Sequence, residues 1–194
     1  MELDYLMKTA RESISTQEAF LEQSGRLVVE AARELGACVR RGGKILILGN
    51  GGSAADAQHM AAEMVGRMLV DRRPLPAVAL TTDTSCLTAI ANDFDYSDVF
   101  SKQIEALARP GDVVIAISTS GNSRNVLKAA SSARAIGCRV IGLTGGGGGK
   151  LKEACDIHLD VARGANSSRI QETHIFVVHS LVDLLDRYFL DAQI

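Results

Sequence analysis

Short apolar runs alternate with amphipathic segments along most of this chain. Each run is bounded by Gly, Pro or polar residues, and the runs cover residues 45–48, 77–81, 113–117, 139–143 and 157–161. Continuous apolar runs of this length are typical of strands buried on both faces of a parallel sheet. Because helical segments separate them, we predict an α/β fold with a doubly wound, five-stranded parallel sheet in the flavodoxin-like order 2-1-3-4-5.

Helical spacing also occurs before the first strand, over residues 3–22 and 27–40, and Gly42-Gly43 would end the second segment. This pair precedes the sheet, so it cannot be a crossover. We expect an N-terminal helical hairpin that packs on a partner subunit or on its own domain. Later helices are expected over residues 53–67, 86–91, a segment ending near 108, 124–136 and 168–189, with a short one before residue 157. The chain is expected to be one domain, 1–194, with N-terminal oligomerisation helices (1–41) and an α/β core (44–190).

The turn after the first strand, Gly49-Asn50-Gly51-Gly52, leads into an Ala-rich helix. We expect Ser53 to be the N-cap of this helix, and the free N–H groups of the turn suit an anion. Further along, His59, Glu63 and Arg67 follow at i, i+4 and i+8 and would share one face. The spacing alone fits a ligand site and a solvated surface pair about equally well.

A second polar turn, Ser118-Thr119-Ser120-Gly121-Asn122-Ser123, follows the third predicted strand. Its hydroxyl groups and the helix N-terminus behind it favour a phosphate monoester, although such a turn can also simply cap a helix. In a sheet of order 2-1-3-4-5, the loops after strands 1 and 3 meet at the switch point. We therefore expect this turn and the turn at Asn50 to line one crevice. A dinucleotide or triphosphate is not indicated, because neither glycine fingerprint occurs.

Histidines elsewhere give weaker signals. Gln171 and His179 would lie about 12 Å apart along the last helix and roughly 80° apart around it, so they form no local metal pair. Taken alone, His179 is interpreted as a buried structural histidine. His158 and His174 are assigned no function.

Composition narrows the class of partner. The 194 residues carry 21 basic and 23 acidic side chains, a formal charge of −2, and only 4% are aromatic, which argues against nucleic acid. The four cysteines form no C-x-x-C pair and are expected to be reduced and buried. The N-terminus lacks the apolar core of a signal peptide, and no apolar run reaches membrane length. A cytoplasmic protein without a membrane partner is expected.

Four segments, GNGGSAADAQHMAAE, LTAIANDF, AISTSGNS and RIQETHIFVVH, resemble in order the motifs of the sugar isomerase (SIS) domain family. The resemblance covers essentially the whole chain and is strongest to members that act on sedoheptulose 7-phosphate. It implies an aldose–ketose isomerase that works through a cis-enediol and supplies a precursor of ADP- or GDP-heptose and lipopolysaccharide. It also implies one Zn²⁺ per subunit and a homotetramer with sites at subunit interfaces.

The same resemblance implies roles for single residues. Glu63 and His179 match the catalytic base and acid, and the metal ligands match His59, Glu63, Gln171 and His179. Asn92 and Asp93, expected in a polar turn, match a substrate-binding pair. The full set of expected substrate contacts is Asn50, Gly51, Gly52, Ser53, Glu63, Arg67, Asn92, Asp93, Ser118, Thr119, Ser120, Ser123 and Gln171.

The alternative is a non-catalytic member of the superfamily that binds the replication initiator protein. Arg124, directly after the last serine of the turn, resembles the sequence of that relative. That relative lacks the acid–base pair, whereas this chain has both Glu63 and His179. An arabinose 5-phosphate isomerase is a third option, but those enzymes usually carry added regulatory domains. The chain departs from the family's pattern at Arg124, in the glycine run 145–149 and in the segment before the last helix, which lacks a proline.

Overall fold

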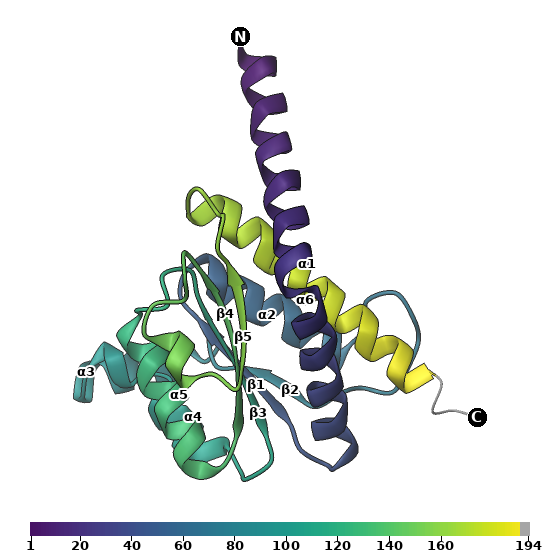
Figure 1. Ribbon diagram of the computed structural model, residues 1–194. Coiled ribbons are helices and arrows are strands. Elements are labelled where there is room, and N and C mark those ends of the chain that lie inside the picture. Colours follow the sequence, from purple (N-terminus) through teal and green to yellow (C-terminus); the bar gives the residue numbers. More distant parts are fainter. Residues whose placement is uncertain (191–194) are drawn as a thin grey trace.

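A five-stranded sheet with helices on both faces forms the centre of the computed structural model, which describes residues 1–190 (Figure 1). The strands are β1 (Ile45–Gly49), β2 (Ala77–Ala79), β3 (Val113–Ser118), β4 (Arg139–Gly145) and β5 (Ile157–Val161). All neighbouring pairs are parallel, in the order β2-β1-β3-β4-β5. The predicted fold class and strand order are confirmed.

Alternation of side chains along the central strands divides the core into two layers. Ile45 and Ile47 face the layer covered by α1 (Glu2–Arg40), α2 (Gly52–Val65) and α6 (Ser167–Leu190). Leu46 and Leu48 face the opposite layer. The elements on that side are α3 (Thr84–Asp93), α4 (Ser101–Leu107), α5 (Arg124–Ile136) and the short 3₁₀ helices Tyr96–Asp98 and Leu151–Ala154. Both faces of β1 and β3 are therefore buried, which explains why their sequences are continuously apolar.

The predicted N-terminal hairpin is wrong, because α1 is one continuous helix of 39 residues. Phe20, Ser24 and Val28 are all buried and are four residues apart, so a single buried stripe crosses the predicted break. Gly25 lies inside the helix, where it costs about 1 kcal/mol relative to Ala. Packing of the stripe against the domain outweighs that cost. The N-terminal turns of α1 extend beyond the other elements (Figure 1). They do so at the end of the molecule where the carboxyl ends of the strands lie.

Some predicted boundaries are confirmed and others shift. The bounds of α5 and β5 agree with prediction, and Gly137 ends α5 in a left-handed conformation with φ 95°. The predicted N-cap Ser53 is wrong, because Gly51 caps α2 with φ 56° and Ser53 lies buried inside the helix. Among the described residues, no helix combines the length and apolar character that a membrane crossing requires.

Candidate active site

His59, Glu63 and His179 come together where α2 and α6 lie side by side, and we call them the His–Glu–His cluster. Glu63 Oε1 lies 3.1 Å from His59 Nε2 and 3.7 Å from His179 Nε2. The two Nε2 atoms are themselves 3.1 Å apart. Both imidazoles are about half exposed, at 47% and 46% of the side chain, whereas the Glu63 side chain is only 15% exposed. The cluster thus opens to solvent above a nearly buried carboxylate.

Interpretation of His179 as a buried structural histidine is wrong. Helical spacing cannot predict the contact of His179 with His59, because the two residues are 120 positions apart in the sequence. The close approach of two ring nitrogens also has a chemical meaning. Two lone pairs repel, so a 3.1 Å contact needs a proton or a cation between them.

The cluster fits a divalent transition metal. The possible ligand atoms of His59, Glu63 and His179 all lie within 4.8 Å of one another. Glu63 Oε2 is buried and has no hydrogen-bond partner in the described part of the chain, so this carboxylate can still accept a bond. Two imidazole nitrogens and one carboxylate oxygen match the donor set of a catalytic zinc site, which keeps one position open.

Gln171 lies away from this cluster. It packs against Gly52, where an added Cβ would meet Gln171 Nε2 at 2.4 Å. Gly52 and His59 are about 10 Å apart along α2, and Gln171 and His179 are similarly spaced on α6. The two contacts show that α2 and α6 run in the same direction. Gln171 makes no hydrogen bond to the cluster within the described part of the chain, so its role as a fourth ligand stays a prediction.

Arg67 does not extend the stripe of His59 and Glu63, so that prediction is wrong. The helix α2 ends at Val65, with Gly66 as its C-cap, and Arg67 lies exposed beyond it. Asn92 and Asp93 are also not in a turn, because they form the exposed last residues of α3. Asn92 Nδ2 donates to Asp93 Oδ1 at 2.8 Å. Their role as a substrate-binding pair stays a prediction.

The loops after β1 and β3 meet at the switch point, as predicted. Asn50 and Asn125 exchange two amide hydrogen bonds of 2.9 and 2.8 Å. Tyr96 donates its hydroxyl to Asn50 Oδ1 at 3.2 Å. Asn125 is buried in the first turn of α5, and its Oδ1 also accepts from Val126 N. Sequence reasoning missed Asn125 and Tyr96, although an asparagine just after the predicted phosphate turn is a signal that could have found the first.

The serine loop, residues 118–123, presents its polar groups at the start of α5. Ser118 Oγ and Ser123 Oγ are 3.0 Å apart, and Ser120 Oγ accepts from the Asn122 backbone N–H at 3.2 Å. Ser123 is the N-cap of α5, but its side chain makes no capping hydrogen bond. The N–H groups of Arg124 and Asn125 therefore remain available to an anion, whereas that of Val126 donates to Asn125 Oδ1. Thr119 and Ser120 are partly or fully exposed beside them.

The glycine loop, residues 145–149, packs directly on the serine loop. Gly121 has φ 62°, and a Cβ there would come within 1.9 Å of Gly148 O. Backbone hydrogen bonds join the two loops from Gly145 N to Thr119 O and from Leu151 N to Gly121 O. Gly146 to Gly149 all have positive φ. The glycine run therefore lets two backbones approach where side chains could not.

Below the glycine loop lies a buried polar network. Thr144 Oγ1 is 2.7 Å from His158 Nε2 and donates to Asp160 Oδ1 at 2.9 Å. Asp160 Oδ2 in turn accepts from Gly147 N at 3.0 Å. Burial lowers the pKa of His158, and the Asp160 charge opposes that shift. His158 thus contacts the strand residue Thr144 that precedes the glycine loop, and its lack of function stays a prediction.

Two further groups on α2 and α6 have perturbed pKa values. Burial raises the pKa of the Asp56 carboxyl to about 6, and the nearby His59 partly offsets this. Burial lowers the pKa of His174, although its hydrogen bond to Thr144 O and the Asp160 charge act in the other direction. Sequence reasoning did not single out Asp56, which lies one turn before His59 on α2.

Comparison with known proteins points to one family. Residues 9–145 match the SIS domain family. A phosphoheptose isomerase from Desulfovibrio desulfuricans is 53% identical over 189 residues, which are 97% of this chain and 90% of that protein. The structure of phosphoheptose isomerase GmhA from Neisseria gonorrhoeae matches with a TM-score of 0.91 at 45% identity, over 96% of this chain and 100% of that one. A phosphoheptose isomerase structure from Francisella tularensis matches with a TM-score of 0.92 at 36% identity, over 96% and 99%.

Proposed function

The chain belongs to the SIS domain family, and from that premise we propose that it interconverts sedoheptulose 7-phosphate and D-glycero-D-manno-heptose 7-phosphate. The observation that carries this proposal is the His–Glu–His cluster, in which a nearly buried carboxylate and two imidazoles meet. The identity to several phosphoheptose isomerases over most of the chain supports the same substrate. The non-catalytic alternative gains no support, because both members of the proposed acid–base pair are present and in contact.

The reaction moves one proton between two carbons and another between two oxygens. In our proposal Glu63 removes the proton from C1 of the ketose, which leaves a cis-enediol, and returns it to C2. His179 accepts the proton of the O1 hydroxyl as that oxygen becomes the aldehyde, and donates a proton to O2. Glu63 Oε1 and His179 Nε2 are 3.7 Å apart, so both can reach adjacent carbons of one substrate. Proton count and charge balance over the cycle.

We further propose that His59, Glu63 and His179 hold Zn²⁺, with Gln171 as the predicted fourth ligand. When bound, the ion would act as a Lewis acid toward the substrate carbonyl. The 3.1 Å contact between the imidazole nitrogens and the unpartnered Glu63 Oε2 support such a site. A carboxylate shared with a metal is a weaker base, and an imidazole nitrogen that holds a metal cannot carry a proton. Glu63 and His179 would therefore have to leave the ion while they move the substrate protons.

The phosphate is proposed to bind at the serine loop. Hydroxyl groups of Ser118, Ser120 and Ser123, with the N-terminal N–H groups of α5, would surround a dianion without any lysine. Asn50, held by Asn125 and Tyr96, would then face the sugar hydroxyls on the opposite wall. The other predicted contacts complete this proposal: Gly51, Gly52, Ser53, Arg67, Asn92, Asp93, Thr119 and Gln171.

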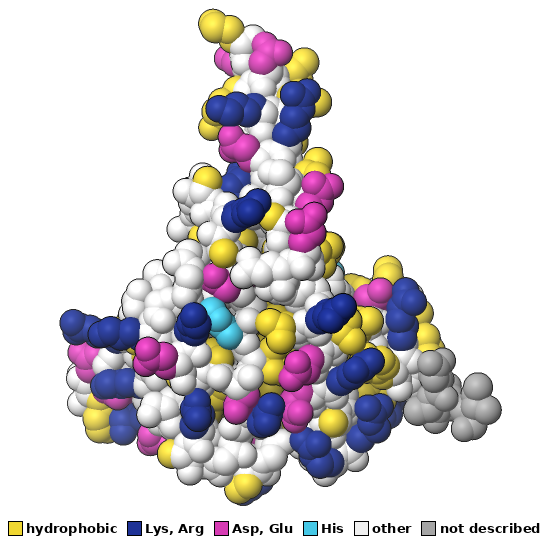
Figure 2. Space-filling view, viewed as in Figure 1, with side chains coloured by type: hydrophobic (Ala, Val, Ile, Leu, Met, Phe, Trp, Pro, Cys, Tyr) yellow, Lys and Arg dark blue, Asp and Glu magenta, His cyan; other side chains and the backbone are white. Residues whose placement is uncertain are grey.

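Self-association is proposed through the projecting end of α1. Its exposed apolar side chains include Leu3, Tyr5, Leu6 and Ile14, and Figure 2 shows hydrophobic groups along this free helix. Exposed apolar surface of this kind favours burial against another copy. A homotetramer would bury it and bring neighbouring subunits close to the site. The variant Leu6→Asp should reduce the mass of the particle measured by light scattering, whereas the exposed-charge control Lys8→Gln should not.

Cytoplasmic action is part of the proposal, since all four cysteines are free thiols. The product would enter ADP- or GDP-heptose synthesis and, through it, lipopolysaccharide.

The direct test is incubation of the purified protein with sedoheptulose 7-phosphate, followed by NMR. We expect the signals of an aldoheptose 7-phosphate to appear, and we expect a chelator to slow their appearance. Solvent deuterium should enter at C2 of the product, because the shuttled proton can exchange while it resides on Glu63. No turnover with or without added Zn²⁺ would reject the isomerase.

A further inference from the structure

Arg72, in the segment between α2 and β2, is a fully buried cation. Its side chain is 0% exposed, and its Nε donates to Asp186 Oδ1 on α6 at 2.8 Å, where the Asp186 side chain is 2% exposed. Removing two charges from water is unfavourable unless their hydrogen bonds are well satisfied. A pair this deeply buried therefore needs partners beyond one ionic contact.

Those partners are the last carbonyl groups of α2. Arg72 Nη2 donates to Glu63 O at 2.9 Å, and Nη1 donates to Met64 O at 2.9 Å and to Gly66 O at 3.0 Å. Carbonyl groups in the last turn of a helix have no partner within the helix. The guanidinium thus replaces the missing helical donors, and one of the groups that it holds is the main chain of Glu63 itself.

The acidic partner lies on the helix that carries His179. Asp186 follows His179 by seven residues, which is about two turns, so the two side chains leave α6 from nearly the same face. Asp186 Oδ2 has no partner among residues 1–190. Within this part of the chain the carboxylate accepts one bond, and the remaining donors of the guanidinium go to the C-terminal end of α2 and to the carbonyl group of Arg73. One side chain joins the end of the helix that carries Glu63 to the helix that carries His179.

We propose that Arg72 is a positioning residue for the active site: with Asp186 it clamps α2 to α6 and so sets the spacing between Glu63 and His179. This inference rests on the proposed function of the His–Glu–His cluster. A planar guanidinium with five donors can serve several carbonyls and a carboxylate at once. A lysine ammonium has one nitrogen and cannot occupy these positions together. The clamp therefore depends on arginine geometry as well as on charge.

The test compares three variants with the wild type in two separate measurements. Arg72→Lys keeps the positive charge but loses the planar guanidinium with its several donors. Asp186→Asn removes the negative charge. The double variant Arg72→Met with Asp186→Leu removes both charges. The first measurement is kcat and KM for sedoheptulose 7-phosphate. The second is Zn²⁺ affinity of the metal-free protein, obtained by competition with a coloured chelator.

Arg72→Lys should lower both kcat and Zn²⁺ affinity by about 10- to 100-fold, the usual effect of losing a group that orients metal or catalytic ligands. KM should change by less than about threefold, because the serine loop lies on other elements. The double variant should unfold at a urea concentration close to that of the wild type, since apolar groups of similar size can replace a buried ion pair. Its kcat and Zn²⁺ affinity should nevertheless stay low.

A matched control pair lies outside α2 and α6, at the amino ends of the strands. Lys44 Nζ and Asp112 Oδ2 form another largely buried pair at 2.6 Å, and the Asp112 side chain is 4% exposed. Asp112→Asn should lower stability while kcat and Zn²⁺ affinity remain within about twofold of wild type.

A double variant with wild-type kcat and wild-type Zn²⁺ affinity would overturn the clamp. If Arg72→Lys and Asp186→Asn fail to fold, the kcat and Zn²⁺ affinity of the double variant alone test the clamp. If the wild type binds Zn²⁺ but does not turn over the substrate, the proposed function fails, and the chelator measurement still tests the clamp.

Discussion

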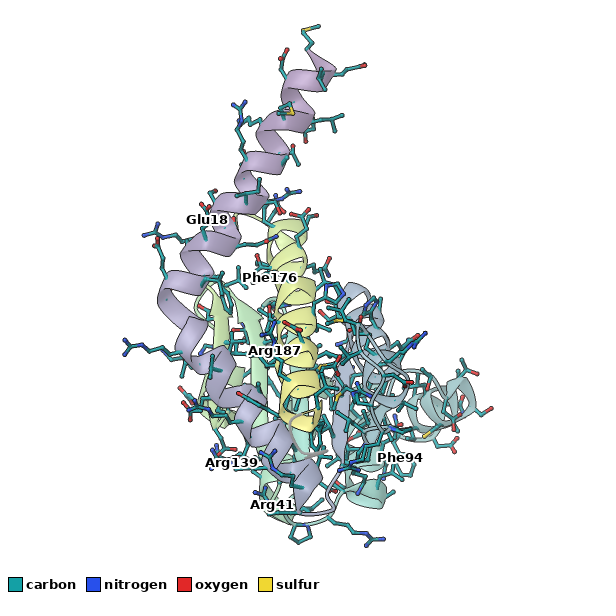
Figure 3. All side chains as sticks on the ribbon, turned by 90° about the vertical axis from the view of Figure 1, so that its right-hand side faces the viewer. Glu18, Arg41, Phe94, Arg139, Phe176 and Arg187 are labelled. Carbon is teal, nitrogen blue, oxygen red and sulfur yellow. The ribbon has the colours of Figure 1, made fainter. Side chains whose placement is uncertain are left out.

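The amino ends of the strands and the helix pair α2 and α6 differ in how their polar groups are satisfied. At the amino ends of the strands, a cavity of about 540 Å³ is lined by Arg41, Lys44, Arg109 and Asp112, among others. Arg41 lies there, at the end of the molecule away from the free tip of α1 (Figure 3). Asp112 accepts hydrogen bonds from Lys44 N, Lys44 Nζ and Arg109 N, so the buried charge is fully paired.

Along α2 and α6, in contrast, several buried polar atoms have no partner among the described residues. Every buried side-chain polar atom without a partner in the described residues belongs to α2 or α6, namely atoms of Asp56, Glu63, Arg169, Glu172, His174 and Asp186. Unpaired buried donors and acceptors are unfavourable and persist where a ligand, an ion or another subunit can use them. The comparison indicates that the cavity beside Asp112 has a structural role, whereas unpartnered buried polar atoms identify the candidate site.

The largest expected effect is that of Glu63→Gln. The amide keeps the shape of the side chain but cannot accept the substrate proton, so kcat should fall by at least about 10²-fold. Binding of the sugar phosphate, measured by calorimetry, should persist because the serine loop is untouched. Near-normal turnover would remove Glu63 as the base and would remove the contrast between the α2–α6 pair and the amino ends of the strands.

Asp112→Asn should have its effect on stability instead. Burial pushes the pKa of Asp112 up, but the bonds from Lys44 and Arg109 more than offset this, so its pKa lies below the ordinary value. Stability from this group is therefore present at neutral pH and is lost as the pH falls. Replacing the charge should reduce the free energy of unfolding by about 2–3 kcal/mol in urea titrations. A fall in kcat of tenfold or more would show that this end also serves the reaction.

Two alanine substitutions in the glycine loop separate backbone strain from contact with the serine loop. Gly149 has φ 51°, and a Cβ there would lie 2.6 Å from Ser120 O, whereas Gly146 has φ 61° and open space around it. Both variants should lose about 1 kcal/mol of stability from the left-handed conformation. Only Gly149→Ala should raise KM for the sugar phosphate, by about tenfold. Equal KM values in the two variants would exclude the glycine loop as a support of the phosphate site.

The smallest effect concerns acid stability. Because burial lowers the pKa of His174, the unfolded chain binds a proton that the folded chain resists. Stability from this group is complete above the ordinary pKa of 6.5 and falls as the pH drops below it, by at most about 1.4 kcal/mol per pH unit. His174→Gln, which can still donate toward Thr144 O, should flatten the slope between pH 7 and pH 5. An unchanged slope would assign the acid sensitivity to other groups, such as His158.

Much of the fold could be predicted because its causes are local. Apolar runs buried on both faces set the strands, and Gly137 ends α5 at the predicted residue. The N-terminal hairpin could not be predicted correctly, because Ser24 and Gly25 resemble a break until the packing of the stripe around them is known. The predicted N-cap of α2 was wrong for a related reason. The cap residue has φ 56°, which glycine adopts readily at Gly51, and Ser53 is buried inside the helix.

The candidate site divides in the same way. Its loops follow from strand order, so the meeting of the Asn50 turn with the serine loop could be predicted. The contact of His179 with His59 could not be predicted from spacing, because it depends on how α6 packs beside α2. The buried pair of Arg72 and Asp186 could not be predicted from the sequence, because charged residues normally lie in solvent.

The amide pair between Asn50 and Asn125 also bears on how this protein ages. Asparagine followed by glycine is prone to deamidation, because the small residue lets its own backbone nitrogen attack the side-chain carbonyl. In the folded chain the Asn50 amide is held in three hydrogen bonds to Asn125 and Tyr96. Chemical conversion of Asn50 should therefore follow unfolding, and it would leave a negative charge beside the proposed phosphate site. Loss of activity on storage would then report past unfolding even after the chain has refolded.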